Sequence, residues 1–96
     1  MELMTLRNFL DKIRNRIDSV KEEIGSHYYY YGKDCIDFDD SGNFVLKISH
    51  NDFFIYDLDQ EINIDSQNNR IEVCESKTGA KSHLTFYSMS VIPVNQ

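Results

Sequence analysis

The chain has 96 residues, of which 41% are hydrophobic and 27% charged, and sixteen acidic against ten basic side chains give a net charge of −6. This length provides for one domain with one core, and the apolar content is too high for a disordered chain. The negative charge argues against a protein that coats duplex nucleic acid or binds membranes through a polybasic surface. We therefore expect residues 1–96 to form a single folded domain.

The sequence also bears on the cellular compartment. No apolar run approaches the roughly 18 residues of a membrane span, and the N-terminal residues lack the regions of a secretory signal peptide. Cys35 and Cys74 form no C-x-x-C motif, which fits a reduced cytosolic chain better than a disulfide scaffold. We expect a cytoplasmic protein, in a bacterial or host-cell cytosol, and whether the two cysteines pair stays open.

The first third of the chain has the apolar spacing of a helix. Thr5 is a good N-cap residue, and Gly25 stands where a left-handed C-terminal cap is wanted. These features predict a helix over about 5–24. The apolar residues recur three and four positions apart, which places them on one helical face: Leu3, Leu6, Leu10, Ile13, Ile17, Val20 and Ile24.

After Gly25 the apolar residues alternate with a period of two, which is typical of strands. The connections are short and rich in turn residues, so they join antiparallel neighbours. The predicted fold class is α+β: one long N-terminal helix packed on an antiparallel meander sheet of about five strands within 27–94. The clearest strand segments are Asn43–Ser49, Asp52–Leu58, Arg70–Glu75 and Ser82–Ile92.

Acidic residues are concentrated in one part of the chain. Residues 34–65 contain nine acids and only Lys47 as a base, a charge of −8, whereas the rest of the chain sums to +2. If 53–65 is extended, its even positions form a buried face (Phe54, Tyr56, Leu58, Ile62 and Ile64). Its odd positions then project together on the other face (Asp57, Asp59, Glu61 and Asp65), and Asp37 and Asp39 form a second such pair. A single-signed block suits a cationic partner; solubility alone is the alternative interpretation.

The candidate motifs for chemistry are weak. Asp37–Gly42 matches the opening of a calcium loop, D-x-D-x-S-G, but the twelfth position is Ile48 instead of a bidentate glutamate. We therefore predict a hairpin turn there. The three histidines and two cysteines lack the local pairs of a zinc site, and neither a glycine-flanked nucleophile nor a phosphate-binding loop is present. We expect no cofactor, no metal and no catalysis; a metal-dependent enzyme built on the aspartates is the alternative.

The run His27–Tyr31 is the most unusual local feature, with four consecutive tyrosines. Aromatic platforms that stack on nucleic-acid bases are surrounded by basic residues, which are missing here, whereas tyrosine is also a preferred interface residue. We predict an edge strand with two tyrosines packed and two exposed, and Tyr28 and Tyr30 as candidate contact residues. The apolar stripe of the predicted helix also permits a helix–helix contact, so monomer and homodimer both stay open.

These features predict a non-catalytic acidic inhibitor or binding protein that blocks a basic, nucleic-acid-binding protein target. In size, charge and lack of a catalytic motif it is comparable to phage anti-CRISPR and anti-restriction proteins that mimic DNA, and to immunity proteins of nuclease toxins. The alternative is an accessory interaction subunit that uses Tyr28–Tyr31 or the helix, with the acidic face merely solvated. Neither function involves direct nucleic-acid or membrane binding. The candidate partner-binding residues are Asp37, Asp39, Asp40, Asp57, Asp59, Glu61, Asp65, Tyr28 and Tyr30.

Overall fold

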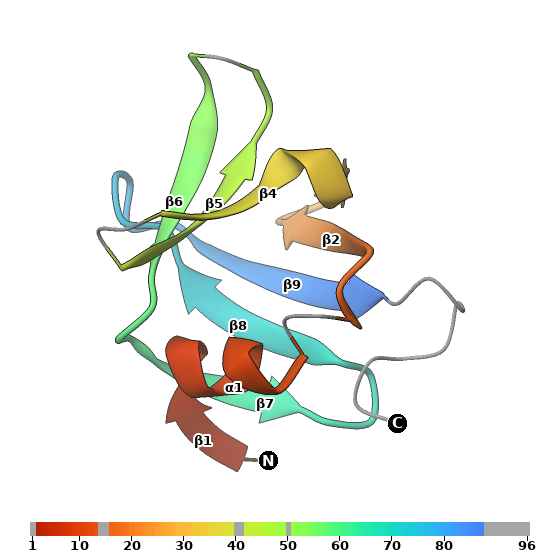
Figure 1. The fold of residues 1–96 in the computed structure, drawn as a ribbon, viewed down its shortest axis with the longest axis vertical. Coiled ribbons are helices and arrows are strands. Elements are labelled where there is room, and N and C mark those ends of the chain that lie inside the picture. Colours follow the sequence, from red (N-terminus) through yellow and green to blue (C-terminus); the bar gives the residue numbers. More distant parts are fainter. Residues whose placement is uncertain (1, 14–15, 40–41, 50, 88–96) are drawn as a thin grey trace.

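The computed structural model describes residues 2–13, 16–39, 42–49 and 51–87. Within these residues the chain forms one α-helix, nine strands and a short 3-10 helix (Figure 1). Their bounds in chain order are β1 Glu2–Thr5, α1 Leu6–Ile13, β2 Ser19–Ile24, β3 His27–Gly32, η2 Lys33–Cys35, β4 Ile36–Asp39, β5 Asn43–Lys47, β6 Phe53–Asp57, β7 Glu61–Asp65, β8 Arg70–Cys74 and β9 Lys81–Tyr87.

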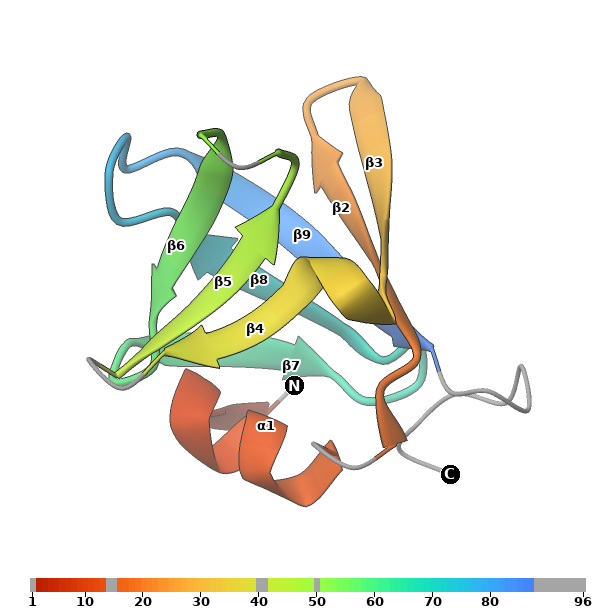
Figure 2. The same ribbon diagram turned by 45° about the horizontal axis from the view of Figure 1, so that its top comes forward.

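The strands form two antiparallel sheets that face each other across one core (Figure 2). One sheet has six strands in the order β1-β7-β8-β9-β2-β3, and the other has three in the order β4-β5-β6. From β2 to β9 the chain is a meander that passes from one sheet to the other between β3 and β4 and again between β6 and β7. β9 then pairs with β2, so both ends of the meander lie in the same sheet.

The helix α1 lies next to β1 and β7 at one end of the molecule (Figure 1). It begins where the sequence predicts, because the Thr5 side-chain oxygen accepts a hydrogen bond from the Asn8 N–H at 3.2 Å, as an N-cap residue does. Its apolar face is buried, and the ring of Phe9 packs against Phe86 of β9 with centroids 5.5 Å apart. One helix face therefore closes the core at this end.

The predicted α+β fold, with a long helix over about 5–24, is wrong. The helix ends at Ile13, and residues 19–24 form β2 between β3 and β9. The cause lies in the pattern itself: residues i and i+4 share a face in a strand as well as in a helix, so Val20 and Ile24 fit both. Gly25 is likewise a turn residue of the β2–β3 hairpin, with φ of 59°, and no helix C-cap.

The predicted sheet of about five strands is also wrong, because two sheets share nine strands. The four clearest predicted segments correspond to β5, β6, β8 and β9, although the predicted continuation of β9 through Ile92 lies outside the described residues. The prediction of a hairpin turn at Asp37–Gly42 is confirmed: β4 pairs with β5 there. The Asp39 carboxylate accepts the Asn43 N–H at 3.1 Å, and Gly42 has a φ of 87°.

None of the described helices is long and apolar enough to cross a membrane. Cys35 and Cys74 are both free thiols in the structure. The described core is a single cluster to which α1 and strands of both sheets contribute.

Candidate functional site

The outer face of the three-stranded sheet carries acids beside apolar side chains. In β4, β5 and β6 every second residue points into the core, as Phe44 and Tyr56 do with no exposed surface. The alternate residues point outward, and the register sets them in rows across the strands. One row is Asp39, Asn43 and Asp57, the next is Asp37, Val45 and Ile55, and the third is Lys47 and Phe53.

This face is hollowed over β4, η2 and the end of β5. The hollow measures about 610 Å³ and is open to solvent. Val45 lies at its base with 6% of its surface exposed, whereas Ile48 is 48% exposed. We call this site the acidic hollow and define it by the residues that line it: Asp34, Cys35, Asp37, Asp39, Val45, Lys47, Ile48, Ser49 and Phe53.

Lys47 is the one base among these nine residues, against three acids. Its Nζ lies 3.2 Å from an Asp37 oxygen, and both side chains are about half exposed. The hydrogen bond from Lys47, together with one from the Phe38 N–H, holds the pKa of the Asp37 carboxyl below its usual range. Asp37 is therefore ionised at neutral pH, and its partner Lys47 is exposed enough to be displaced by another cation.

The structure separates the acidic residues that the sequence groups together. Asp57 lies on the same outer face as Asp39, and Asp59 follows in a turn where Arg7 Nε is 3.2 Å from its carboxylate. Glu61 and Asp65 belong to β7 in the other sheet. The expected single row along 53–65 is thus wrong, because the chain turns at 58–60 and changes sheets. Asp40 lies outside the described residues.

Several of these acids also shape the turns of the chain. The Asp57 carboxylate accepts the Asp59 N–H at 2.9 Å, and Asp39 does the same for Asn43. Asp65 accepts bonds from Gln67 and Asn68, and the Asn68 side chain is the main cause that lowers the pKa of Asp65. Aspartate is favoured in turns for this purpose. Turn formation therefore accounts for part of the acidic composition.

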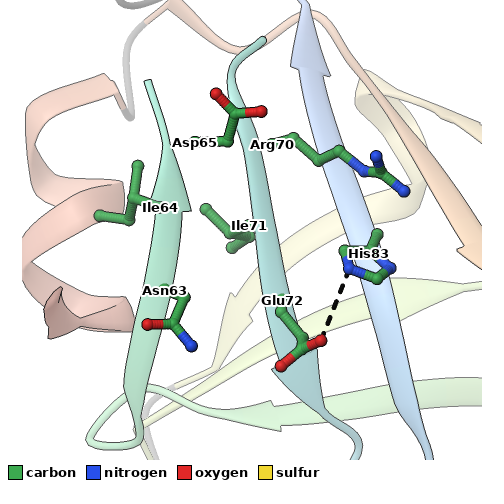
Figure 3. Close-up of a pocket in the computed structure, with 7 residues that line it drawn as sticks. All are labelled: Asn63, Ile64, Asp65, Arg70, Ile71, Glu72 and His83. Atoms are coloured by element: carbon green, nitrogen blue, oxygen red, sulfur yellow. Dashed lines mark ion pairs between the residues drawn. The ribbon is translucent and has the colours of Figure 1, made fainter. Parts of the chain in front are cut away.

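The outer face of the six-stranded sheet has a different character. A hollow of about 220 Å³ there is lined by residues of both signs (Figure 3): Asn63, Ile64, Asp65, Arg70, Ile71, Glu72 and His83. His83 Nε2 lies 3.5 Å from Glu72, and Arg70 Nη2 lies 2.8 Å from Glu23 of β2. Because the cation Arg70 lies between Asp65 of β7 and Glu23 of β2, this face offers no field of one sign.

The tyrosine run forms β3 at the end of the six-stranded sheet, so the prediction of an edge strand is confirmed. Tyr28, Tyr29 and Tyr30 are 63%, 48% and 69% exposed, and Tyr31 is buried. The predicted count of two packed and two exposed is wrong. The β2–β3 hairpin extends beyond the core (Figure 2), so Tyr29 stays exposed although it shares a strand face with Tyr31.

Sequence reasoning missed a buried acid. Glu22 of β2 is fully buried and accepts hydrogen bonds from the hydroxyls of Tyr31, at 2.8 Å, and of Tyr56. Burial, and next the bonds to Glu22, raise the pKa of both tyrosines well above the usual value. The sequence signal that could have revealed this acid is Val20: in a strand over 19–24, Glu22 lies two residues further along and therefore on the same inner face.

In the described part of the chain no group of three or more His, Cys, Asp or Glu residues is arranged to hold a metal ion.

Comparison of the chain with protein-family models, with curated proteins and with solved structures finds no match. Among the surfaces of the described residues, the acidic hollow has the geometry and charge that best support a function.

Proposed function

We propose that the protein is a non-catalytic binding protein whose acidic hollow receives basic side chains of a protein target and covers the surface with which that target binds nucleic acid. The observation that carries the proposal is the composition of the hollow. Asp34, Asp37 and Asp39 stand beside the apolar side chains of Val45 and Phe53. Lysine and arginine have an apolar stem and a charged head, so they complement a surface of this kind.

The overall charge distribution supports the same partner. The segment 34–65, which contains all of β4 and β5 and every residue that lines the hollow, carries a charge of −8. Complementary charge accelerates association and makes it salt-dependent over about 8–10 Å in physiological buffers. Dense lysine and arginine are typical of surfaces that hold nucleic acid. A target of that type would be inhibited by competition with its nucleic acid.

The test starts from a partner captured from host lysate at low salt and released at high salt. Its association rate with the wild type is compared with that of an Asp34→Lys/Asp37→Lys variant, which reverses two charges in the hollow. We expect association to slow at least about ten-fold, because like charges now face the target. The matched control is Glu61→Lys/Glu72→Lys, which changes the net charge equally on the other sheet.

Association that is slowed equally by both variants would show a dependence on net charge alone and would refute the role of the hollow. Association that neither variant slows would refute the electrostatic proposal altogether. The captured partner is then loaded with a labelled oligonucleotide. We expect the wild type to displace the oligonucleotide and the hollow variant to leave it bound.

A second candidate function is the accessory interaction subunit, favoured by the three exposed tyrosines of β3. A Tyr28→Ala/Tyr30→Ala variant distinguishes the two functions, because these side chains lie on the other sheet and line no part of the acidic hollow. Loss of partner binding in this variant, with binding unchanged in the hollow variant, would favour the accessory subunit.

A further inference from the structure

The sheet edges of this fold differ in how they are protected from pairing with another strand. The edge strand β4 carries Asp37 and Asp39, and charged side chains discourage pairing. The far side of β6 is occupied, since Ile55 N–H donates to Glu75 at 2.8 Å and Ser76 N–H donates to the Ile55 carbonyl at 2.7 Å. β3 has neither protection: it contains no proline, aspartate, glutamate, lysine or arginine.

Within residues 2–13, 16–39, 42–49 and 51–87, β3 pairs with β2 and with no other strand. The two strands are joined by a two-residue loop, Gly25–Ser26, with a positive φ at Gly25 as in a type II′ turn. The residues that flank such a loop form a hydrogen-bonded pair, and pairs then alternate along the ladder. Tyr28 and Tyr30 therefore direct their backbone N–H and C=O groups toward the open edge.

We propose that two copies of the chain associate through this edge, with β3 of one copy antiparallel to β3 of the other. The two-fold axis passes beside Tyr29, so that Tyr28 of each copy lies opposite Tyr30 of its partner. This register joins the outward-directed backbone groups of both strands in one ladder. The two six-stranded sheets then become one continuous sheet.

Side chains on the outer face make the edge complementary to itself. Tyr30 is paired with Lys21 of β2, and Tyr28 is paired with Glu23. In the proposed register each row across the dimer runs from Lys21 through Tyr30 to the partner copy's Tyr28 and Glu23. Opposite charges thus stand at the two ends of each row, and aromatic pairs meet in the middle, where such pairs are favourable.

Repulsion between two acidic chains does not oppose this contact directly. Residues 1–33, which include β2 and β3, carry a net charge of +1. The pairing also uses none of the residues that line the acidic hollow, so it does not depend on the proposed function. The occupant of the β3 edge is thus a second copy of this chain and not a strand of a different protein.

The experiment measures mass by sedimentation equilibrium over a concentration series. We expect the wild type to form a dimer. A Tyr28→Lys/Tyr30→Lys variant and a Tyr28→Glu/Tyr30→Glu variant should each be monomeric, because the register sets like charges opposite one another. An equimolar mixture of the two variants should dimerise again, since lysine now faces glutamate. The control is Leu3→Lys on β1, an exposed apolar residue at the other end of the sheet, which should stay dimeric.

The register has a separate test in a Cys35→Ser/Cys74→Ser background. A Tyr29→Cys substitution places two thiols across the two-fold axis in a non-hydrogen-bonded pair, where Cα atoms are about 4.5 Å apart and a disulfide is sterically allowed. We expect mild oxidation to cross-link this variant and to leave a Tyr28→Cys control uncross-linked.

Three results would overturn the proposal: a wild type that is monomeric at every concentration, a dimer that survives in both charged double variants, or a mixture of those variants that stays monomeric. A monomeric wild type whose tyrosine variants lose a captured partner would assign the edge to a different protein and would also refute pairing of two copies. Unchanged far-ultraviolet circular dichroism in every variant shows that the monomer fold is retained.

Discussion

The carboxylate of Glu22 on β2 accepts a hydrogen bond from the hydroxyl of Tyr56 on β6, so a fully buried acid of the six-stranded sheet is bonded to the three-stranded sheet. Its other oxygen accepts the hydroxyl of Tyr31 on β3. A buried polar group is costly unless it is hydrogen-bonded, and a buried charge more so. The three side chains therefore stabilise one relative position of the two sheets.

A Glu22→Ala substitution should destabilise the protein by at least about 2 kcal/mol, because it leaves two buried hydroxyls without their acceptor. Glu22→Gln should cost less, since the amide oxygen still accepts one bond. The free energies of unfolding come from denaturant titrations of the three proteins. A Glu22→Ala variant as stable as the wild type would contradict a structural role for this cluster.

The same cluster predicts a loss of stability at high pH. The pKa values of Tyr31 and Tyr56 are raised in the folded state, whereas unfolded tyrosine titrates near pH 10. The unfolded chain therefore releases protons first, and stability that is fully present below about pH 10 falls as the pH rises further. In a Tyr31→Phe/Tyr56→Phe variant this fall should be much shallower. Denaturation midpoints measured from about pH 8 to pH 11 compare the two proteins, and parallel curves would contradict the prediction.

The wrong prediction of the fold class has its cause in the first quarter of the chain. The apolar stripe correctly marks buried positions, since Leu6, Leu10, Ile17 and Val20 are all in the core. The stripe does not determine whether the backbone between these buried positions is helical or extended. Asp18, Ser19 and Val20 are poor helix formers, and pairing with β3 and β9 satisfies the backbone of residues 19–24 in the sheet. The secondary structure of residues 19–24 is therefore determined by pairing with a strand that is distant in the sequence, which a local pattern does not reveal.

The negative charge of the acidic hollow could be predicted from the sequence, but its shape could not. Residue counts alone locate the excess of acid in 34–65, and alternation correctly puts Asp57 outside and Tyr56 inside. The sequence does not reveal that the chain changes sheets at 58–60, which separates Glu61 from Asp57. It also does not reveal the hollow, because its base at Val45 depends on how β4, η2 and β5 lie together.

A second buried carboxylate predicts the behaviour at low pH. Glu75 accepts hydrogen bonds from the N–H groups of Ile55, Lys77 and Thr78 and from the Thr78 hydroxyl. Burial alone raises the pKa of Glu75, but these bonds outweigh it, and the pKa lies below its ordinary value. Its contribution to stability is present above the unfolded value of about 4.3 and is lost as the pH falls through the lower folded value.

A Glu75→Gln variant should accordingly lose less stability than the wild type between about pH 7 and pH 3, because glutamine does not titrate. At neutral pH it should be less stable than the wild type, since bonds to a charged acceptor are the stronger ones. Urea unfolding at both pH values provides the measurement. An Asp59→Asn variant, exposed in the β6–β7 turn, is the control and should follow the wild type.

The last prediction concerns Lys47, which already neutralises part of the acidic hollow. Its Nζ lies 3.2 Å from Asp37, and a cationic side chain of a partner has to displace it in order to reach that carboxylate. A Lys47→Ala substitution removes the competitor. Exposed ion pairs are worth at most about 1 kcal/mol, so affinity for the captured partner should rise by up to about five-fold.

Two measurements check this prediction for Lys47. Nuclear magnetic resonance titration should show the pKa of Asp37 rising toward its ordinary value, because its bond to Lys47 is the main cause of the present shift. Kinetic binding experiments should show faster association, with the gain disappearing at high salt. The control is Lys81→Ala on β9, which removes the same charge from the other sheet and should leave both the Asp37 pKa and the association rate close to those of the wild type. Slower association of Lys47→Ala would show that the lysine itself contacts the partner, and that the hollow does not act as a receptor for cations.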